Sequence, residues 1–275
     1  ESSFISFLPI IFICKKFYKV NIQFIPMGLV DKYLKGNWIS KKTIKTCFKY
    51  ADNVLFIGKG ELNAAQENIS FYTEKYNYIP FSIDINHWQF KPRKSKQLNN
   101  ILFIGNDQNR DFELLYSIAK NCKDYNFTIV TDNDKLGFKN LKNVRFLKGN
   151  LRENILSDNE ILNLYHNADL VILPLRSSTQ PSGQSVAIQS MSAGTPVLIT
   201  RTIGFWDNEK YIDSENIFFI EDEKLESWLN RLKQFSDNLD ILFSTSHKGR
   251  KLAEEGHSLY KFVRELNNYL VGIEL

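Results

Sequence analysis

The fold follows from the stretch Asp169-Leu-Val-Ile-Leu-Pro-Leu-Arg-Ser-Ser-Thr-Gln-Pro-Ser-Gly-Gln-Ser-Val-Ala-Ile-Gln-Ser-Met-Ser-Ala-Gly-Thr-Pro-Val-Leu-Ile-Thr200. Leu170–Leu173 is wholly apolar, which is typical of a parallel strand buried on both faces. A polar loop bounded by prolines follows, and it leads into a helix predicted from about Gly183 to Ala193. A second apolar run, Val197–Ile199, comes next. The stretch therefore predicts a strand–helix–strand unit of a parallel sheet.

The start of the predicted helix carries the chemistry of this unit. Ser182 is the expected N-cap, and Gly183, Gln184 and Ser185 offer free backbone N–H groups at the positive end of the helix dipole. Such a helix start suits a phosphate or a diphosphate. Gln189 lies one turn further along the same side and could reach a ribose attached to that phosphate. The alternative is a capped crossover helix on which Gln189 faces solvent.

Two segments of this stretch resemble the donor-binding signature of a known enzyme family. The signature is that of the retaining, nucleotide-sugar-dependent glycosyltransferases of group 1 (family 4). The segments that resemble it are Ser182-Gly-Gln-Ser185 and Gln189-Ser-Met-Ser-Ala-Gly-Thr-Pro-Val197. That family has Glu-Gly-Phe-Gly, a helix, a second Glu and Ala-Met-Ala-Ala-Gly-x-Pro-Val. This chain has the Ser-Gly-Gln variant: the first Glu falls on or near Pro181, and the second is replaced by Gln189.

Composition sets the bounds of the interpretation. The chain has 275 residues, 43% hydrophobic and 24% charged, which indicates a soluble globular protein with room for two domains. A net charge of +4 permits phosphorylated ligands or an anionic membrane surface but does not indicate a nucleic-acid binder. Cys14, Cys47 and Cys122 are scattered without metal-ligand spacing, as expected of buried thiols in a reducing compartment.

The resemblance implies an α/β fold with two Rossmann-like domains (GT-B type), the first of them incomplete, with parallel sheets flanked by helices. We expect residues 1–84 to form a partial N-terminal, acceptor-side domain and residues 85–99 to form a linker. Residues 100–257 would form the nucleotide-sugar-binding domain, and residues 258–275 a helix that crosses back to the first domain. A complete first domain of the family needs about twice the residues, so an N-terminally truncated fragment is expected.

Local patterns also predict several helix starts and a turn. Ser40 is a predicted N-cap, and Ser157 with Glu160 three residues later predicts a capping box. Gly58-Lys59-Gly60-Glu61 follows a predicted strand and opens a helix, as a dinucleotide-binding fingerprint would. Because Asn63 stands where that fingerprint has its third glycine, a tight strand-to-helix turn is the better interpretation.

A second candidate phosphate site follows the strand that opens the second domain. Gly105 permits a sharp turn at the carboxyl end of this strand, where open α/β sheets bind ligands. Arg110 stands at the entrance of the next helix and could pair bidentately with a phosphate. The family has Gly-Arg and then Lys-Gly here, so Arg110 matches the Lys and Asn106 replaces the Arg. The alternative is a solvated Arg110 paired with Asp107 or Asp111.

The resemblance places two further loops at the same rim. Gly149 and Asn150 follow a strand where the family's backbone contacts the nucleobase. Gly204, Phe205 and Trp206 lie where the family closes over the donor sugar. The two aromatic rings suit stacking on a sugar face, and packing between domains is the alternative.

The apolar run Phe4–Ile13, followed by Lys15 and Lys16, is too short to span a bilayer. It is predicted to be a core helix with a basic end. An interfacial membrane helix is the alternative.

The resemblance implies glycosyl transfer with retention, from a nucleotide diphosphate sugar to a glycan or lipid-linked acceptor. Arg110 and the amide groups of Gly183–Ser185 would stabilise the leaving diphosphate in place of a metal, so no cofactor is expected. A cytoplasmic enzyme is expected, with peripheral contact at the inner face of the membrane as an addition. The alternative is a non-catalytic homologue that binds nucleotide sugars or regulates, favoured by the missing glutamates and by Asn106.

Overall fold

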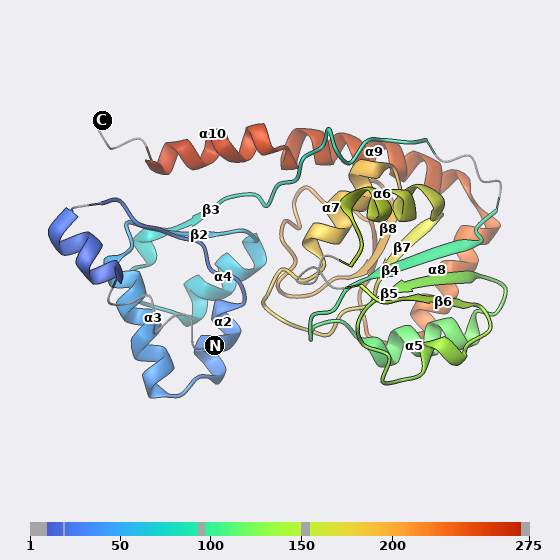
Figure 1. Ribbon diagram of the computed structural model, residues 1–275, viewed down its shortest axis with the longest axis horizontal. Helices are drawn as coiled ribbons and strands as arrows, with labels where there is room; N and C mark the ends of the chain where they lie inside the picture. The colour runs from blue at the N-terminus through green and yellow to red at the C-terminus, as the bar shows by residue number, and fades with distance from the viewer. Residues whose placement is uncertain (1–9, 19, 93–96, 150–154, 271–275) are drawn as a thin grey trace.

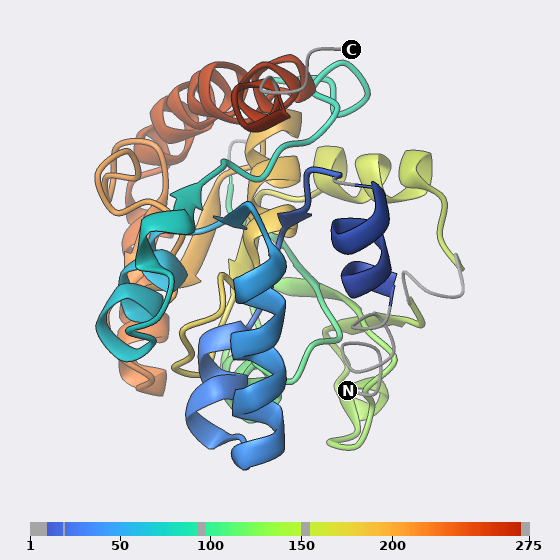
Figure 2. The same cartoon turned by 90° about the vertical axis from the view of Figure 1, so that its left-hand side faces the viewer.

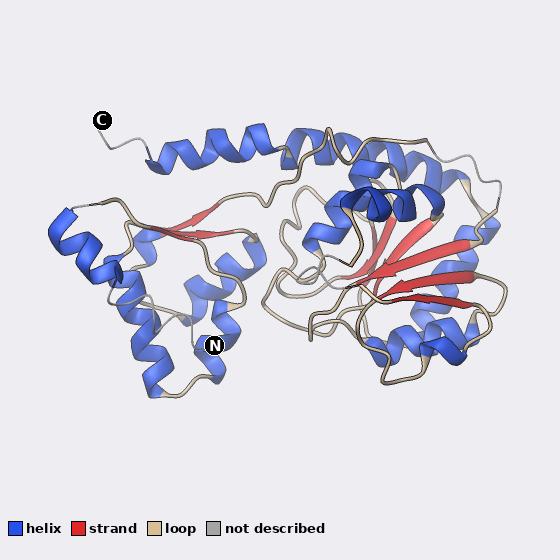
Figure 3. Cartoon of the chain, in the orientation of Figure 1, coloured by secondary structure: helices blue, strands red, loops and turns tan. Residues whose placement is uncertain are grey.

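The computed structural model describes residues 10–18, 20–92, 97–149 and 155–270. It contains two parallel sheets, each flanked by helices (Figures 1 and 3). One sheet belongs to the first part of the chain and the other to residues from Asn100 onward. The predicted α/β class with two Rossmann-like units therefore has direct structural support.

The second domain is a six-stranded parallel sheet with the strand order of a doubly wound fold. In spatial order its strands are β6 (Val144–Leu147), β5 (Asn126–Val130), β4 (Asn100–Ile104), β7 (Leu170–Leu173), β8 (Val197–Thr200) and β9 (Phe218–Ile220). The chain starts at β4, moves to β5 and β6, and then returns to β7 on the other side. The order therefore reverses between β4 and β7, and the crevice at their carboxyl ends is where such sheets bind ligands.

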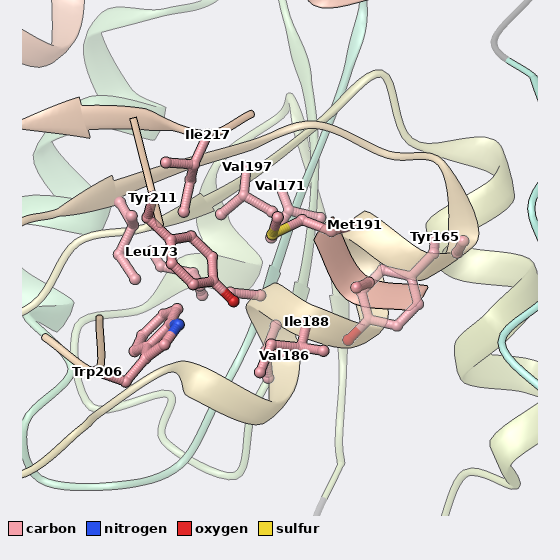
Figure 4. Close-up of a cluster of buried hydrophobic side chains, with 14 of the residues drawn as sticks. Tyr165, Val171, Leu173, Val186, Ile188, Met191, Val197, Trp206, Tyr211 and Ile217 are labelled. Atoms are coloured by element: carbon pink, nitrogen blue, oxygen red, sulfur yellow. The ribbon is translucent and has the colours of Figure 1, made fainter. Parts of the chain in front are cut away.

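Helices cover both faces of this sheet because every central strand is apolar on both sides. The helices are α5 (Phe112–Asn121), α6 (Asp158–Asn167), α7 (Gln184–Ala193), α8 (Leu225–Asp237) and α9 (Asp240–His257). Val171 and Leu173 of β7 join a core with side chains of α6 and α7, shown in Figure 4. Leu170 and Ile172 join a second core with side chains of α5 and α8. The apolar run thus fills both faces, as predicted.

The first domain has a three-stranded parallel sheet in the order β1 (Gln23–Phe24), β2 (Asn53–Phe56), β3 (Tyr76–Tyr78). The helices α2 (Leu29–Lys35), α3 (Trp38–Tyr50) and α4 (Lys59–Asn68) contribute to a core on one face. The helix α10 (Leu259–Leu270) packs Phe262, Leu266 and Tyr269 on the other face. Figure 2, with the first domain toward the viewer, shows α10 at the top and α3 below the sheet.

The chain crosses between the domains twice at one place. The backbone N–H of Ile83 donates to the carbonyl of His257 at 2.9 Å, beside the junction of α9 and α10. The His257 ring contacts the Phe81 carbonyl at 2.6 Å and the Tyr211 hydroxyl at 2.8 Å. Burial lowers the pKa of His257 to about 4, so this ring is neutral near pH 7.

The predicted helix starts are partly confirmed. Ser157 and Glu160 form the predicted capping box at the start of α6. The prediction that Ser40 is the N-cap of α3 is wrong. Asn37 caps this helix, and its side chain accepts from the Ser40 N–H at 3.0 Å. The prediction that Ser182 is the N-cap of α7 is also wrong, since Gly183 occupies that position.

The N-terminal apolar run is not a core helix in the part that the structure describes. Residues 10–13 are helical and continue into η1 (Cys14–Tyr18), a short π-helical segment without a buried residue. Ile10 and Phe17 are 55% and 66% exposed. The core-helix prediction is therefore wrong for residues 10–18. No helix among the described residues is long and apolar enough to cross a membrane.

Candidate functional site

The candidate site lies at the reversal point of the second sheet, where two loops are joined by hydrogen bonds. The loop after β4 and the loop after β7 are connected by backbone bonds from Asp111 N–H to Pro174 at 3.0 Å and from Arg176 N–H to Asn109 at 2.9 Å. The side-chain amide of Asn109 donates to Ser182 Oγ at 2.8 Å. The carboxyl ends of β4 and β7 thus present one continuous surface to the first domain.

Arg110 is the central side chain of this surface. It is 3% exposed, and its guanidinium lies between two glycines. A Cβ on Gly105 would overlap Arg110 Nε, and a Cβ on Gly183 would lie 2.8 Å from Arg110 Nη1. Only residues without a side chain leave room for the guanidinium at both positions, so the two glycines and the arginine form one unit.

The charge of Arg110 is incompletely compensated. Its Nε lies 3.3 Å from Asp107 Oδ2, which is the pairing expected under the alternative interpretation. Neither Nε nor Nη1 makes a hydrogen bond of good geometry within the described chain. Burial lowers the pKa of the Arg110 guanidinium, while Asp107 opposes that shift. A buried cation with unsatisfied donors favours an anionic ligand.

The N-terminus of α7 supplies further donors beside Arg110. Gly183 adopts a left-handed conformation with φ 80° and ψ −6°, and no side chain caps the helix. Within the described chain, no acceptor is found for the backbone N–H groups of Gly183, Gln184, Ser185 and Val186. Arg110 Nη1 lies beside the first of these residues, Gly183, so the guanidinium and the start of α7 offer neighbouring donors of the kind that a phosphate accepts from.

Several predicted donor-site residues have protein partners instead. Asn106 donates to the Gly149 carbonyl at 2.6 Å and accepts from the Thr131 hydroxyl at 2.8 Å, so it joins the ends of three strands. Gln184 Nε2 donates to the Ile57 carbonyl of the first domain at 2.9 Å. The side chain of Gln184 is therefore directed at the first domain, and its backbone N–H is the group that remains predicted to contact a ligand. Asn150 lies outside the described residues.

The predicted sugar-side loop is an interdomain contact. Phe205 and Trp206 are 1% and 0% exposed, and their rings stack on each other with centroids 4.1 Å apart. Their carbonyl groups accept from the backbone N–H groups of Gly60 at 3.2 Å and Lys59 at 2.8 Å. The prediction that these rings stack on a sugar is therefore wrong. Both rings pack against Tyr211 in the core of the second domain, whereas the backbone of their loop makes the contact with the first domain. At Gly204, a Cβ would overlap the Thr179 backbone.

Two acidic residues of the first domain were not found from the sequence. Asp31 accepts from Ser178 Oγ at 2.8 Å and from Thr179 Oγ1 at 2.9 Å, which holds the loop after β7 against α2. Glu61 is fully buried, and its Oε1 accepts from the Leu29 N–H at 2.7 Å. Burial raises the pKa of Glu61 to about 7. No local pattern signals either contact, because the partners lie far away in the chain.

The described residues contain no group of three or more His, Cys, Asp or Glu placed to hold a metal ion. The cationic side chain beside the start of α7 is that of Arg110. Because a guanidinium offers donors in a fixed plane, it can match two oxygens of a phosphate.

Comparison with known proteins agrees with this architecture. The family described as glycosyl transferases group 1 matches residues 99–238. HepE of Anabaena, solved with UDP and glucose, is 14% identical with a TM-score of 0.76, over 97% of this chain and 75% of HepE. Sucrose-phosphate synthase of Thermosynechococcus elongatus is 16% identical with a TM-score of 0.70, over 90% of this chain and 65% of that enzyme.

A third similar structure is TarM of S. aureus, 16% identical with a TM-score of 0.72, over 93% of this chain and 51% of TarM. No curated protein matches the chain. Likeness at these identities establishes the fold, so the predicted α/β class with two Rossmann-like domains of GT-B type is confirmed.

Proposed function

The chain belongs to the group 1 glycosyltransferases, and from this premise we propose that it transfers a sugar from a nucleoside diphosphate sugar to a glycan or lipid-linked acceptor, with retention. The observation that carries the proposal is the buried guanidinium of Arg110 beside the uncapped N-terminus of α7. Structures of HepE with UDP and glucose show that a protein of the same fold binds such a nucleotide.

In the proposed reaction, the bond between the sugar and the diphosphate breaks, and negative charge develops on the leaving diphosphate. Arg110 Nη1 and the amide groups of Gly183–Ser185 are the donors that would stabilise this charge. They are fixed before the reaction by the glycines and by the helix. The proposal therefore requires no metal ion or cofactor.

The rest of the proposed donor site follows from the same geometry. Ser185 and Gln189, on the partly exposed side of α7, would line the path of the ribose. Gly149 would approach the nucleobase through its backbone, although its carbonyl already accepts from Asn106. Asn106 and Gln184 are proposed to support the site rather than to contact the donor with their side chains.

The proposed test combines binding and turnover. Titration calorimetry with UDP, GDP, ADP and NAD should show micromolar binding of one nucleoside diphosphate and none of NAD. The sugar conjugate of the preferred nucleotide should then be cleaved or transferred without added metal. Nucleotide binding without transfer to any acceptor would favour the non-catalytic alternative. Failure of all these nucleotides to bind would contradict the proposed function.

A membrane-bound acceptor is proposed from the surface of the first domain. The turn between α2 and α3 exposes Leu34, Trp38 and Ile39, which are 47%, 71% and 47% exposed. The lysines Lys35, Lys42 and Lys45 are exposed on the same two helices. Indole and lysine side chains are typical of contact with anionic lipid surfaces, so we place the protein at the inner face of the membrane.

Sedimentation with lipid vesicles tests this placement. The protein should sediment with vesicles that contain phosphatidylglycerol but not with vesicles of pure phosphatidylcholine. Trp38→Ala should weaken the association several-fold, because it removes an exposed indole that would insert into the lipid interface. Equal behaviour with both vesicle types would contradict the membrane contact and leave the transferase proposal intact.

A further inference from the structure

The helix α7 presents a narrow polar edge to the site. All of its residues except Ser185 and Gln189 are buried, and these two lie one turn apart on one side of the helix. Gln189 lies about 9 Å along the helix axis from Gly183, at a rise of about 1.5 Å per residue. It is therefore the partly exposed polar side chain of α7 that lies farther from the start of the helix.

Gln189 is held by a buried tyrosine. The hydroxyl of Tyr165, in α6, donates to Gln189 Oε1 at 3.1 Å. Tyr165 is fully buried, and Figure 4 shows it at the edge of the core beside α7. Its carbonyl accepts from Thr195 Oγ1 at 2.7 Å, and its ring meets the ring of Trp88 edge to face. Contacts to both the backbone and the ring of Tyr165 therefore fix the position of its hydroxyl.

This contact decides which end of the Gln189 amide faces a ligand. With Oε1 engaged by Tyr165, the Nε2 group is the free end, and no described residue accepts a hydrogen bond from it. An amide nitrogen only donates, whereas the carboxylate of a Glu only accepts. Burial also raises the pKa of the Tyr165 phenol, so its proton remains available for this contact.

We propose that Tyr165 is a positioning residue that makes Gln189 a hydrogen-bond donor to a ribose hydroxyl oxygen of the donor nucleotide. This inference rests on the proposed function, because it names the ligand group that the same site would recognise. Tyr165 itself does not touch the nucleotide. It acts by orienting the amide, and the diphosphate is bound independently by Arg110 and the start of α7.

Calorimetry with two probes tests this division of roles. The probes are inorganic pyrophosphate and the nucleoside diphosphate that binds the wild type, beginning with UDP. Tyr165→Phe should weaken the nucleotide about threefold to tenfold, as expected for one hydrogen bond, and should change pyrophosphate affinity less than about twofold. Gln189→Ala should have the same pattern. The double variant should bind the nucleotide no worse than Gln189→Ala alone.

The matched control is Tyr125→Phe, which removes a hydroxyl that contacts Ser236 Oγ at 2.7 Å, in the other core of the domain. It should leave both affinities unchanged. Unaltered nucleotide binding by Tyr165→Phe, equal loss of pyrophosphate, or additive loss in the double variant would each overturn the inference. If no nucleotide binds the wild type, the proposed function fails, and the inference fails with it.

Discussion

The turns after β4 and after β2 both follow the sequence Leu-Phe-Ile-Gly, which ends at Gly105 and at Gly58, but they differ in what lies beside their glycines. After β4, the side chain of Arg110 occupies the place of a Cβ on Gly105. After β2, the second domain is the neighbour: a Cβ on Gly58 would lie 3.0 Å from Pro181 Cβ, and a Cβ on Gly60, at the start of α4, would overlap the Ile203 carbonyl. One turn thus makes room for a ligand-binding cation, and the other makes room for a domain contact. A glycine in such a turn predicts close approach but does not reveal the neighbour.

The largest effect on stability is expected at the second of these turns. Gly60→Ala places a methyl group against the backbone of the 203–205 loop, which cannot move without separating the domains. We expect the free energy of unfolding to fall by about 1–3 kcal/mol, measured by urea denaturation. The control is Gly256→Ala in α9, where the nearest atom would lie 3.9 Å away and alanine favours the helix. Equal stability of the two variants would contradict the packing described.

Glu61 makes the same turn sensitive to pH. Its pKa is raised from 4.5 to about 7 in the folded protein, so the folded state favours the protonated form. The stability that this provides is complete below pH 4.5 and is lost as the pH rises through 7. Between these limits the free energy of unfolding of the wild type should fall by about 3 kcal/mol relative to that of Glu61→Gln. Because His257 titrates in both proteins, its contribution cancels when their free energies of unfolding are compared at each pH. A difference that does not change with pH would contradict the raised pKa of Glu61.

Gly105→Ala is the converse experiment at the first turn. Its methyl group would displace the Arg110 guanidinium, a side chain rather than a backbone, from its position beside Gly183. We expect nucleotide affinity to fall about tenfold, equivalent to about 1.4 kcal/mol, with a smaller change in stability than for Gly60→Ala. Calorimetry should therefore show the larger loss of nucleotide affinity for Gly105→Ala, and urea denaturation the larger loss of stability for Gly60→Ala. The same ranking in both measurements would show that the turns do not differ as described.

The smallest effect is expected at Asp31, which connects α2 to the loop that precedes α7. Asp31→Ala leaves the hydroxyls of Ser178 and Thr179 without this acceptor and should cost about 1 kcal/mol of stability. Asp31→Asn keeps an acceptor oxygen and should cost about half as much. Thermal unfolding of the three proteins measures the series. An unchanged Asp31→Ala variant would indicate that the interface does not depend on this contact.

The features that the sequence predicted correctly are those set by neighbouring residues. The apolar runs in β7 and β8 and the capping box of Ser157 and Glu160 are each contained in a few residues. The incorrect N-cap at Ser182 shows the limit, because Asn109, far earlier in the chain, donates to its hydroxyl. The contacts of Asp31 and Glu61 likewise depend on distant partners. Side-chain roles that require two loops to meet could not be predicted without the fold.

The candidate site shows the same division. The resemblance led to Arg110 and Gly183, which the structure brings together beside an uncapped helix. It also led to Phe205 and Gln184, whose side chains are buried in packing and in a contact with Ile57. A family pattern locates a loop, but the packing of the whole chain decides which way each side chain points.

The central claim is that Arg110 holds the diphosphate of the donor, and calorimetry of a nucleoside diphosphate on two arginine variants tests it most directly. Arg176 lies in the adjoining loop but is half exposed and pairs with Glu113 at 3.5 Å, so Arg176→Gln removes the same charge without affecting the proposed site. We predict that Arg110→Gln weakens binding about tenfold or more, whereas Arg176→Gln changes it less than about twofold. Equal affinities of both variants and the wild type would contradict the claim.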